Sequence, residues 1–561
     1  MASDNSESAF LRPPSDEEHP PVYRRTPHYN PLHTFRLPTG HDRQYQQQYG
    51  DMYFLRLASL KPAVEQVAAE AWDGFSIAGE HARRVERVLD VRQGELCWVA
   101  GTIYMDMPLK PNVLDDLTKD NFTLAPPPRR TYQDASNPSL TQIMLEDESG
   151  RLRLTGSLLS STQLATGAII AALGTENANG DFEVVDIKVP DLPRQPTRWE
   201  RDEPSQQSEK EPAGGSKIAF VSGLGITGTS SDSLALELLT DYLLGYTGTG
   251  TSSSTEATPA DPSSISRLII AGDSLGSSVA AEAAADNNNS TTGPKKKPPG
   301  PKKYGYDASS YNPSPITHFD AFLADLLPSI PVTLLPGAAD PANFALPQQG
   351  IHRAMLPRAR AYVAGPPPSG DTEQQQQPGW LDSVTNPWEG DVEGWRVWGS
   401  SGQNVDDVFR YLDFGDGDDD EDSRSTPDRE DEKGEEDSEA RLRVMEAMLR
   451  WRCGVPTAPD TLWSYPFQSH DPFVLQSCPH IFFAGNQPRF KTAVVEGDSP
   501  LKLNGTDAEM TDIMETTSGP RVRLLAIPRF HETGELLLVD SESLEVEVVR
   551  FGAFRGQEER K

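Results

Sequence analysis

Four short glycine-containing segments, each following an apolar run, constrain the fold of this chain more than any other feature. The runs cover residues 217–221, 267–271, 331–335 and 481–484, and helical patterns cover 234–244 and 316–327. The segments read Ser222-Gly223-Leu224-Gly225, Gly272-Asp273-Ser274-Leu275-Gly276, Gly337-Ala338-Ala339-Asp340 and Gly485-Asn486-Gln487-Pro488. Apolar strands that alternate with helices are typical of a sheet buried on both faces. We therefore predict a large α/β domain over residues 216–561, completed by strands near 522–527, 535–539 and 544–549, the last two antiparallel.

The four segments resemble the strand-end motifs of calcineurin-like phosphoesterases, which read roughly S-D-x-H, G-D-x-x-D, G-N-H-D and G-H-x-H. In those enzymes, carboxylates and imidazoles hold two cations that clamp a phosphate and activate water. Here Asp273 and Asp340 remain, and Asn486 replaces a histidine. The other ligand positions carry residues without a ligating side chain, namely Gly223, Gly225, Gly276, Ala338, Ala339 and Pro488.

We expect these residues, together with Asn404 from a later block, to form a vestigial pocket with no catalytic residue and no metal. One alternative is that the segments are ordinary glycine loops at sheet ends. Another is an active metal-dependent phosphodiesterase or exonuclease. His352, His480 and His531 lie nearby in sequence, but a lone histidine in such a chain is more often structural or exposed.

The N-terminal half has a different pattern. A helical stretch covers residues 52–71, and Pro62 is expected to break it into two pieces. Short strands follow, and a Ser149-Gly150 turn predicts a hairpin between two of them. The strands cover residues 96–104, 142–147, 151–155, 168–174 and 181–187. About five antiparallel strands in this length favour a barrel of the oligonucleotide/oligosaccharide-binding (OB) type within residues 41–190, and a β-sandwich is the alternative.

The remaining segments are polar. Residues 1–40 are interpreted as a flexible arm, and residues 191–215 as a linker between the domains. Low-complexity inserts in the α/β domain are expected to be disordered surface loops near residues 247–264, 286–303, 365–379, 413–440 and 498–520. A possible nuclear import signal, for which a flexible basic loop is the alternative, comprises Lys295, Lys296, Lys297, Lys302 and Lys303.

Charge and cysteine content exclude several functions. The formal net charge is −33, so the bulk surface is unsuited to binding nucleic acid. Residues 413–439 carry 15 acidic and 3 basic residues, and are interpreted as a solvated insert or a binder of basic partners. The three cysteines, without a CxxC, fit a reducing compartment with neither a disulfide framework nor structural zinc. No apolar run is long enough to span a membrane, and the polar N-terminus does not resemble a signal peptide.

Several blocks resemble the small, or B, subunits of eukaryotic replicative DNA polymerases, and those of DNA polymerase delta in particular. They cover residues 43–45, 53, 56–57, 99–102, 107–111, 221–225, 335–349, 385–387, 401–405, 409–411 and 456–462. Ser401-Gly402-Gln403-Asn404-Val405 and Pro456-Thr457-Ala458-Pro459-Asp460-Thr461-Leu462 favour polymerase delta over the alternatives, polymerases alpha and epsilon.

The resemblance implies an OB barrel followed by a catalytically inactive phosphoesterase-like domain. It also implies a nuclear scaffold that holds the cysteine-rich C-terminal module of the catalytic subunit and docks the third, clamp-contacting subunit. The sliding clamp would then be reached indirectly, and DNA only weakly or through the complex. No cofactor is expected in this chain, because the iron–sulfur or zinc module belongs to the catalytic subunit.

Overall fold

The computed structural model describes part of the 561-residue chain. These residues are 24, 28–38, 48–77, 79–111, 130–134, 137–196, 215–229, 233–246, 262–276, 312–363, 379–412, 427–497 and 519–552. The five lysines of the predicted import signal lie outside them. So does most of each predicted insert, namely residues 247–261, 286–303, 365–378, 413–426 and 498–518.

Five strands near the N-terminus close into a barrel, because β5 pairs with strands on both of its sides. The strands are β5 (Leu96–Asp106), β6 (Gln142–Glu146), β7 (Arg151–Thr155), β8 (Ile169–Glu176) and β9 (Phe182–Lys188). The predicted hairpin is β6–β7. The prediction of antiparallel strands fails at one pair, since β7 and β9 run parallel. That parallel pair lets the last strand return beside β8 and complete the barrel wall.

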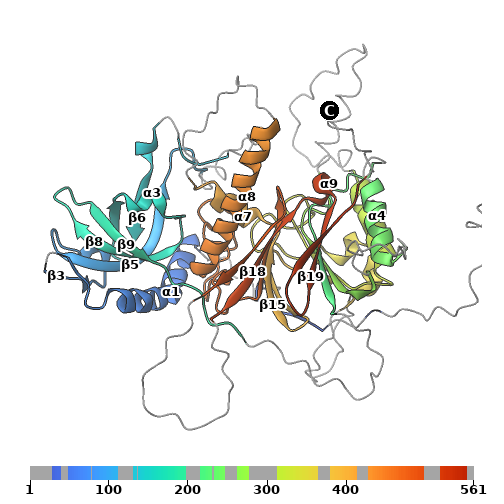
Figure 1. The fold of residues 1–561 in the computed structure, drawn as a ribbon, viewed down its shortest axis with the longest axis horizontal. Coiled ribbons are helices and arrows are strands. Elements are labelled where there is room, and N and C mark those ends of the chain that lie inside the picture. Colours follow the sequence, from blue (N-terminus) through green and yellow to red (C-terminus); the bar gives the residue numbers. More distant parts are fainter. Residues whose placement is uncertain are drawn as a thin grey trace, which may run out of the picture.

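A long helix, α1 (Tyr49–Trp72), covers the barrel on the side of β5 and β8 (Figure 1). The prediction that Pro62 breaks this helix is wrong, because the helix continues through it. Pro62 is exposed, whereas a continuous stripe from Met52 to Trp72 is buried. The burial of apolar side chains along this stripe outweighs the loss of one backbone hydrogen bond at Pro62.

The rest of the chain builds two six-stranded sheets, with strand orders β1-β14-β15-β16-β18-β17 and β13-β12-β11-β10-β19-β20. The first sheet contains β1 (Tyr29–Pro31), β14 (Trp388–Val392), β15 (Trp395–Ser400), β16 (Ile481–Gln487), β17 (Lys491–Glu496) and β18 (Arg521–Pro528). The second contains β10 (Lys217–Val221), β11 (Ile265–Ala271), β12 (Val332–Leu335), β13 (Leu381–Ser383), β19 (Glu535–Asp540) and β20 (Val546–Arg550). As predicted, β19 and β20 are antiparallel.

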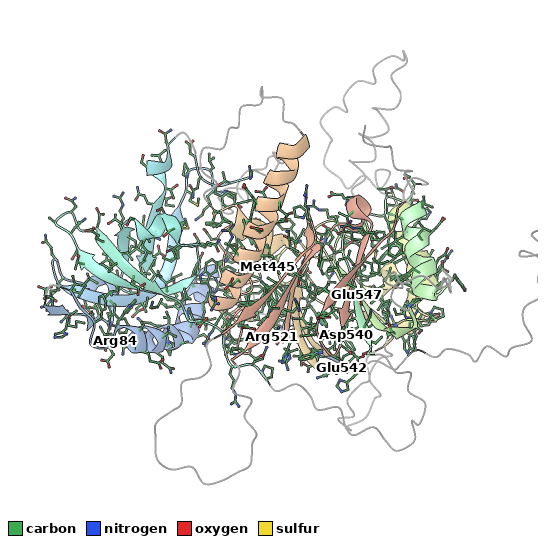
Figure 2. All side chains as sticks on the ribbon, in the orientation of Figure 1. Arg84, Met445, Arg521, Asp540, Glu542 and Glu547 are labelled. Atoms are coloured by element: carbon green, nitrogen blue, oxygen red, sulfur yellow. The ribbon has the colours of Figure 1, made fainter. Side chains whose placement is uncertain are left out.

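The two sheets pack face to face, with helices on their outer sides. Phe220 of β10 meets Phe483 of β16 between the sheets, with ring centroids 5.4 Å apart. The helices α4 (Ser233–Leu244) and α6 (Ser314–Leu326) pack on the outer face of the second sheet. The helices α7 (Gln403–Phe409) and α8 (Pro427–Arg450) pack on the first, where Met445 is fully buried (Figure 2). No helix in the described ranges is long and apolar enough to cross a membrane.

Two predictions about polar segments need correction. Residues 427–440 of the predicted acidic insert belong to α8, and Pro262–Ser264 form a short 3-10 helix. Residues 28–38 of the predicted flexible arm are held on the two-sheet domain, because β1 pairs antiparallel with β14. The side chain of Phe35 is 1% exposed and stacks on Phe473. Burial of this ring explains why a short polar segment is fixed in place.

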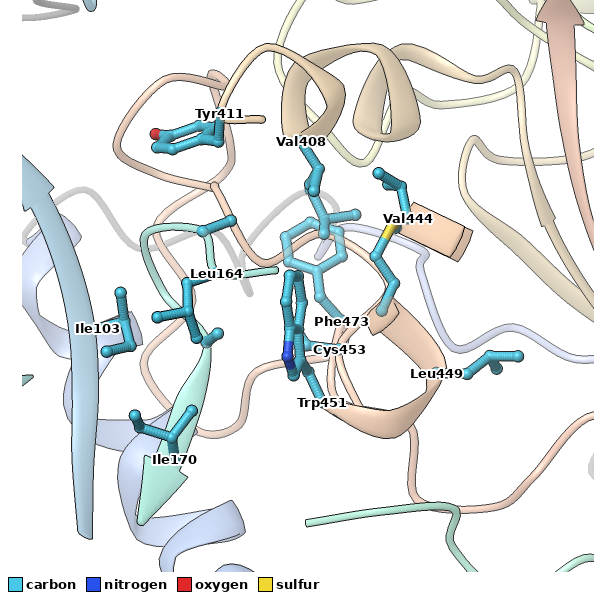
Figure 3. Packing of buried hydrophobic residues seen from close by; sticks show 14 of the residues in the cluster. Ile103, Leu164, Ile170, Val408, Tyr411, Val444, Leu449, Trp451, Cys453 and Phe473 are labelled. Atoms are coloured by element: carbon cyan, nitrogen blue, oxygen red, sulfur yellow. The ribbon is translucent and has the colours of Figure 1, made fainter. Parts of the chain in front are cut away.

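One hydrophobic cluster joins the barrel to the two-sheet domain (Figure 3). Ile103, Leu164 and Ile170 enter it from the barrel side. Val444 and Trp451 enter it from α8 and the segment that follows. The two halves of the chain therefore share one core and do not merely touch at their surfaces.

A buried arginine also links the two halves. Arg56 of α1 is fully buried, and its Nε lies 2.7 Å from Oδ2 of Asp471. Its guanidinium also donates to the carbonyl oxygens of Pro456 (2.5 Å) and Ala458 (3.0 Å). Burial lowers the pKa of Arg56, but the charge and hydrogen bond of Asp471, together with smaller effects of Cys453 and Tyr53, raise it overall. The arginine thus stays charged while its donors tie α1 to the segment after α8.

Candidate functional site

The carboxyl ends of β10, β11, β12 and β16 bring the four glycine-containing segments together. The amide of Gly223 donates to the carbonyl of Gly272 over 2.9 Å. The amide of Asn486 donates to Oγ of Ser222 over 2.7 Å, which ties the two sheets to each other. Parallel strands end at the same edge, so segments distant in sequence meet there.

The two carboxylates that survive in the motifs are occupied by backbone amides. Asp340 is 6% exposed and accepts hydrogen bonds from the amides of Gly337 (2.8 Å), Leu275 (3.0 Å) and Ser274 (3.2 Å). Asp273 accepts one from the amide of Ala339 over 2.9 Å. Together the two carboxylates link the loop after β11 to the loop after β12.

Both carboxyl groups hold their protons more tightly than usual. Burial, reinforced by the negative charge of Asp273, raises the pKa of Asp340 to about 6. Burial also raises the pKa of Asp273.

Close packing fills the space that metal-ligating side chains would need. Gly223 and Gly225 have φ angles of 59° and 60°, in the left-handed region that favours glycine. A Cβ at Gly223 would lie 2.7 Å from Oδ1 of Asn486, and one at Gly225 would lie 2.8 Å from the ring of His531. These two positions cannot take a larger residue without movement of their neighbours.

The remaining predicted site residues are placed differently. A Cβ at Gly276 would lie 2.7 Å from the carbonyl of Gly225, so this glycine also belongs to the packed region. Ala338 and Ala339 are exposed, and Pro488 is half-buried. Asn404 is buried but bonds elsewhere, accepting from Ser400 Oγ and donating to the carbonyl of Gly454, each over 2.7 Å. Asn404 thus anchors α7 to the segment after α8.

The three histidines near the motifs make local contacts with the backbone. Nδ1 of His531 lies 2.8 Å from the carbonyl of Gly223. His352 accepts from the amide of Ala354, and His480 from the amide of Arg396. Across the ranges that the structure describes, no group of three or more His, Cys, Asp or Glu residues is arranged to hold a metal ion.

Sequence reasoning missed a buried amide network beside these loops. The Nδ2 group of Asn386 lies 2.8 Å from Oε1 of Gln348, 2.7 Å from Oγ of Ser401 and 2.8 Å from Oε1 of Gln403. Nδ2 of Asn486 donates to the carbonyl of Ser401 over 2.9 Å. A signal exists in the sequence, because residues 335–349, 385–387 and 401–405 all belong to the blocks that resemble the polymerase small subunits. Only the three-dimensional structure shows that these three blocks contact one another.

Comparisons with known proteins agree with this arrangement. Residues 48–187 match the family model described as the DNA polymerase delta subunit OB-fold domain. Residues 218–492 match the family model for the B subunit of DNA polymerases alpha and epsilon. The chain is 33% identical to the DNA polymerase delta small subunit of Saccharomyces cerevisiae over 530 residues, or 93% of each chain. The chain belongs to the DNA polymerase delta small-subunit family.

Relatives from plants and animals support the same family. The identity to the DNA polymerase delta small subunit of Oryza sativa is 30%, over 90% of this chain and 93% of the relative. The identity to DNA polymerase delta subunit 2 of Drosophila melanogaster is 29%, over 92% of this chain and 95% of the relative. As a member of the DNA polymerase delta small-subunit family, the chain is an accessory subunit in DNA replication. The prediction of an OB-type barrel is confirmed, and the β-sandwich alternative is not needed.

Proposed function

We propose that this chain is a non-catalytic scaffold in DNA polymerase delta, and that its two-sheet domain is an inactive relative of the calcineurin-like phosphoesterases. The packing at the motif loops carries the proposal. At two positions that would hold metal ligands, Gly223 and Gly225, an added side chain would collide with Asn486 and His531 respectively. The two remaining carboxylates bind backbone amides. Such loops are suited to stabilising the fold and not to binding two cations.

In this proposal the chain acts in the nucleus and binds two protein partners. One is the C-terminal cysteine-rich module of the catalytic subunit, which would carry the only iron–sulfur or zinc site of the pair. The other is the third subunit, through which the sliding clamp is reached. The shared core between the barrel and the two-sheet domain supports a scaffold role, because it fixes the relative position of surfaces on both halves.

The rival function is a metal-dependent phosphodiesterase or exonuclease. The purified chain would be incubated with Mn²⁺ or Zn²⁺, desalted, analysed for bound metal, and assayed on a phosphodiester and on single-stranded DNA. We expect no stoichiometric metal and no turnover. Stoichiometric metal, with turnover that Asp340→Ala abolishes while the variant keeps its circular dichroism spectrum, would establish the enzyme and refute the scaffold-only proposal.

Co-purification tests the assignment to one complex. The tagged chain would be expressed with the catalytic and third subunits of polymerase delta, and in parallel with those of polymerases alpha and epsilon. We expect recovery of both polymerase delta subunits. Recovery of primase in their place would assign the chain to polymerase alpha.

A further inference from the structure

The last strand of the second sheet has an open edge. Within the described part of the chain, β20 pairs with β19 on one side and with no strand on the other. The amide of Asp540 donates to the carbonyl of Glu545, and the amide of Phe551 donates to the carbonyl of Gly534. Because bonded and non-bonded pairs alternate along an antiparallel ladder, the backbone groups of Val546, Val548 and Arg550 point outward.

This edge strand is long and rich in valine. Edge strands are normally short or carry charges that discourage pairing. The edges formed by β1 and β13 fit this rule, since these strands have three residues each. β20 has five residues, three of them valine. Its two charged side chains are both engaged within the chain, Glu547 with Lys217 and Arg550 with Glu535, each over 2.7 Å.

The remaining long edge, β17, provides a comparison within the same molecule. It has six residues, and its backbone also points outward at every second position, including Val494. However, Lys491 forms an ion pair with Glu435 of α8, and α8 packs beside the strand. Lys491 is paired within the chain just as Glu547 and Arg550 are, so the charges do not distinguish the two edges. The difference is that α8 packs beside β17, whereas α4 contacts Phe551, beyond the end of β20, through Tyr242.

The charge beside β20 indicates the chemistry of a partner. The turn before the strand is acidic, with Asp540 and Glu542 at the lower end of the sheet (Figure 2) and Glu545 directly before β20 in the sequence. Burial raises the pKa of Asp540, but hydrogen bonds from the amides of Ser543 and Glu542, a hydrogen bond from the Ser543 hydroxyl and the charge of Lys217 together lower it, which favours the ionised form of Asp540. Val546, Val548 and Val549 are half-buried and present apolar surface on both faces of the strand.

We propose that β20 is a docking edge for an extended segment of a partner subunit, which adds to the second sheet as a further strand. The segment would alternate apolar residues and would carry Lys or Arg at the end that lies against the acidic turn. Backbone hydrogen bonds supply affinity in this mode of binding, and side chains supply specificity. The inference rests on the proposed scaffold function and names one of its contact surfaces.

Val548→Pro tests the edge with little effect on the fold, because the deleted N–H points away from β19. Proline is tolerated in edge strands when the missing donor faces solvent. Val494→Pro makes the same change on the β17 edge and is the matched control. The variants would be compared with wild type in the reconstituted complex, by affinity measurement for each subunit and by hydrogen exchange. We expect Val548→Pro to weaken binding of one subunit about tenfold or more, and Val494→Pro to have little effect.

Hydrogen exchange gives a readout that does not need a variant. In the complex, the amides of Val546, Val548 and Arg550 should become protected, whereas in the free chain they should exchange freely. The inference is overturned if Val548→Pro binds like wild type, if these amides gain no protection, or if they are already protected in the free chain. A dimer of this chain that Val548→Pro dissolves would also overturn it, because the occupant would be a second copy. Failure of the wild-type chain to bind either subunit would instead sink the scaffold function itself.

Discussion

Arg56→Met removes the guanidinium that ties the barrel side to the two-sheet domain while keeping the length of the side chain. The substitution leaves Asp471 as a buried charge without its partner, and leaves the carbonyls of Pro456 and Ala458 without their donor. Removing one member of a buried ion pair typically costs about 3–5 kcal/mol. We therefore expect the free energy of unfolding to fall by about 4 kcal/mol.

The matched control is Arg84→Met. The ion pair between Arg84 and Glu65 has the same 2.7 Å separation, but the arginine side chain is 52% exposed. Exposed pairs contribute about 1 kcal/mol or less, so the control should lose little stability. Urea unfolding followed by tryptophan fluorescence measures both variants, since Trp72 and Trp98 lie at the contact of α1 with the barrel. Equal losses for the two variants would refute the claim that burial makes the Arg56 pair important.

A double substitution separates the ion pair from the loss of packing. If the cost of Arg56→Met comes from the stranded charge of Asp471, then adding Asp471→Asn should relieve part of it. We expect a coupling energy of about 1–3 kcal/mol between the two positions. Strict additivity of the two single changes would show that the pair itself is not the source of the loss.

Three further predictions concern other parts of the fold. Gly225→Ala should destabilise the chain by about 1–3 kcal/mol in urea unfolding, because the added Cβ would meet His531 and the φ angle of this residue is positive. Gly50→Ala is the control and should be neutral or slightly stabilising, because no atom from elsewhere in the chain lies within 4 Å of the added Cβ. Burial raises the pKa of Asp340 to about 6 in the folded chain, so its ionised form destabilises the fold above pH 6, and this effect disappears as the pH falls toward 4. Relative to Asp340→Asn, the free energy of unfolding of the wild type should therefore rise by about 3 kcal/mol on acidification. Parallel curves of stability against pH for the two proteins would contradict this. Pro62→Ala should raise the midpoint of thermal unfolding, since it restores a backbone donor in the exposed face of α1, and a lower midpoint would count against the helix as described.

Features with a local signal were predictable from the sequence. The three parallel core strands of the second sheet, β10, β11 and β12, are apolar runs with a glycine within two residues of their ends, and the Ser149-Gly150 turn marks the barrel hairpin. The convergence of Gly223 and Asp340 follows from the rule that parallel strands of one sheet end at the same edge, whereas Asn486 lies in the other sheet and reaches them through the packing of the two sheets.

Features that depend on distant partners were not predictable. The strand Tyr29–Pro31 has only three residues, and its partner β14 lies more than 350 residues away, so no periodicity marks it. The lack of space at Gly225 depends on His531, which comes from the other end of the two-sheet domain. The rule that proline breaks a helix considers only the local backbone. It fails at Pro62 because it does not take into account the buried stripe along α1.

The hydrophobic cluster shared by the barrel and the two-sheet domain has a thermodynamic consequence for the assembled polymerase. Residues from both halves must leave water together, so neither half can unfold without exposing apolar surface of the other. A subunit that binds only the barrel will therefore also stabilise the distant sheets, by an amount set by its concentration and affinity. Binding of a partner subunit to one side of the molecule should therefore also increase resistance to proteolysis on the opposite side, because both depend on the same unfolding equilibrium.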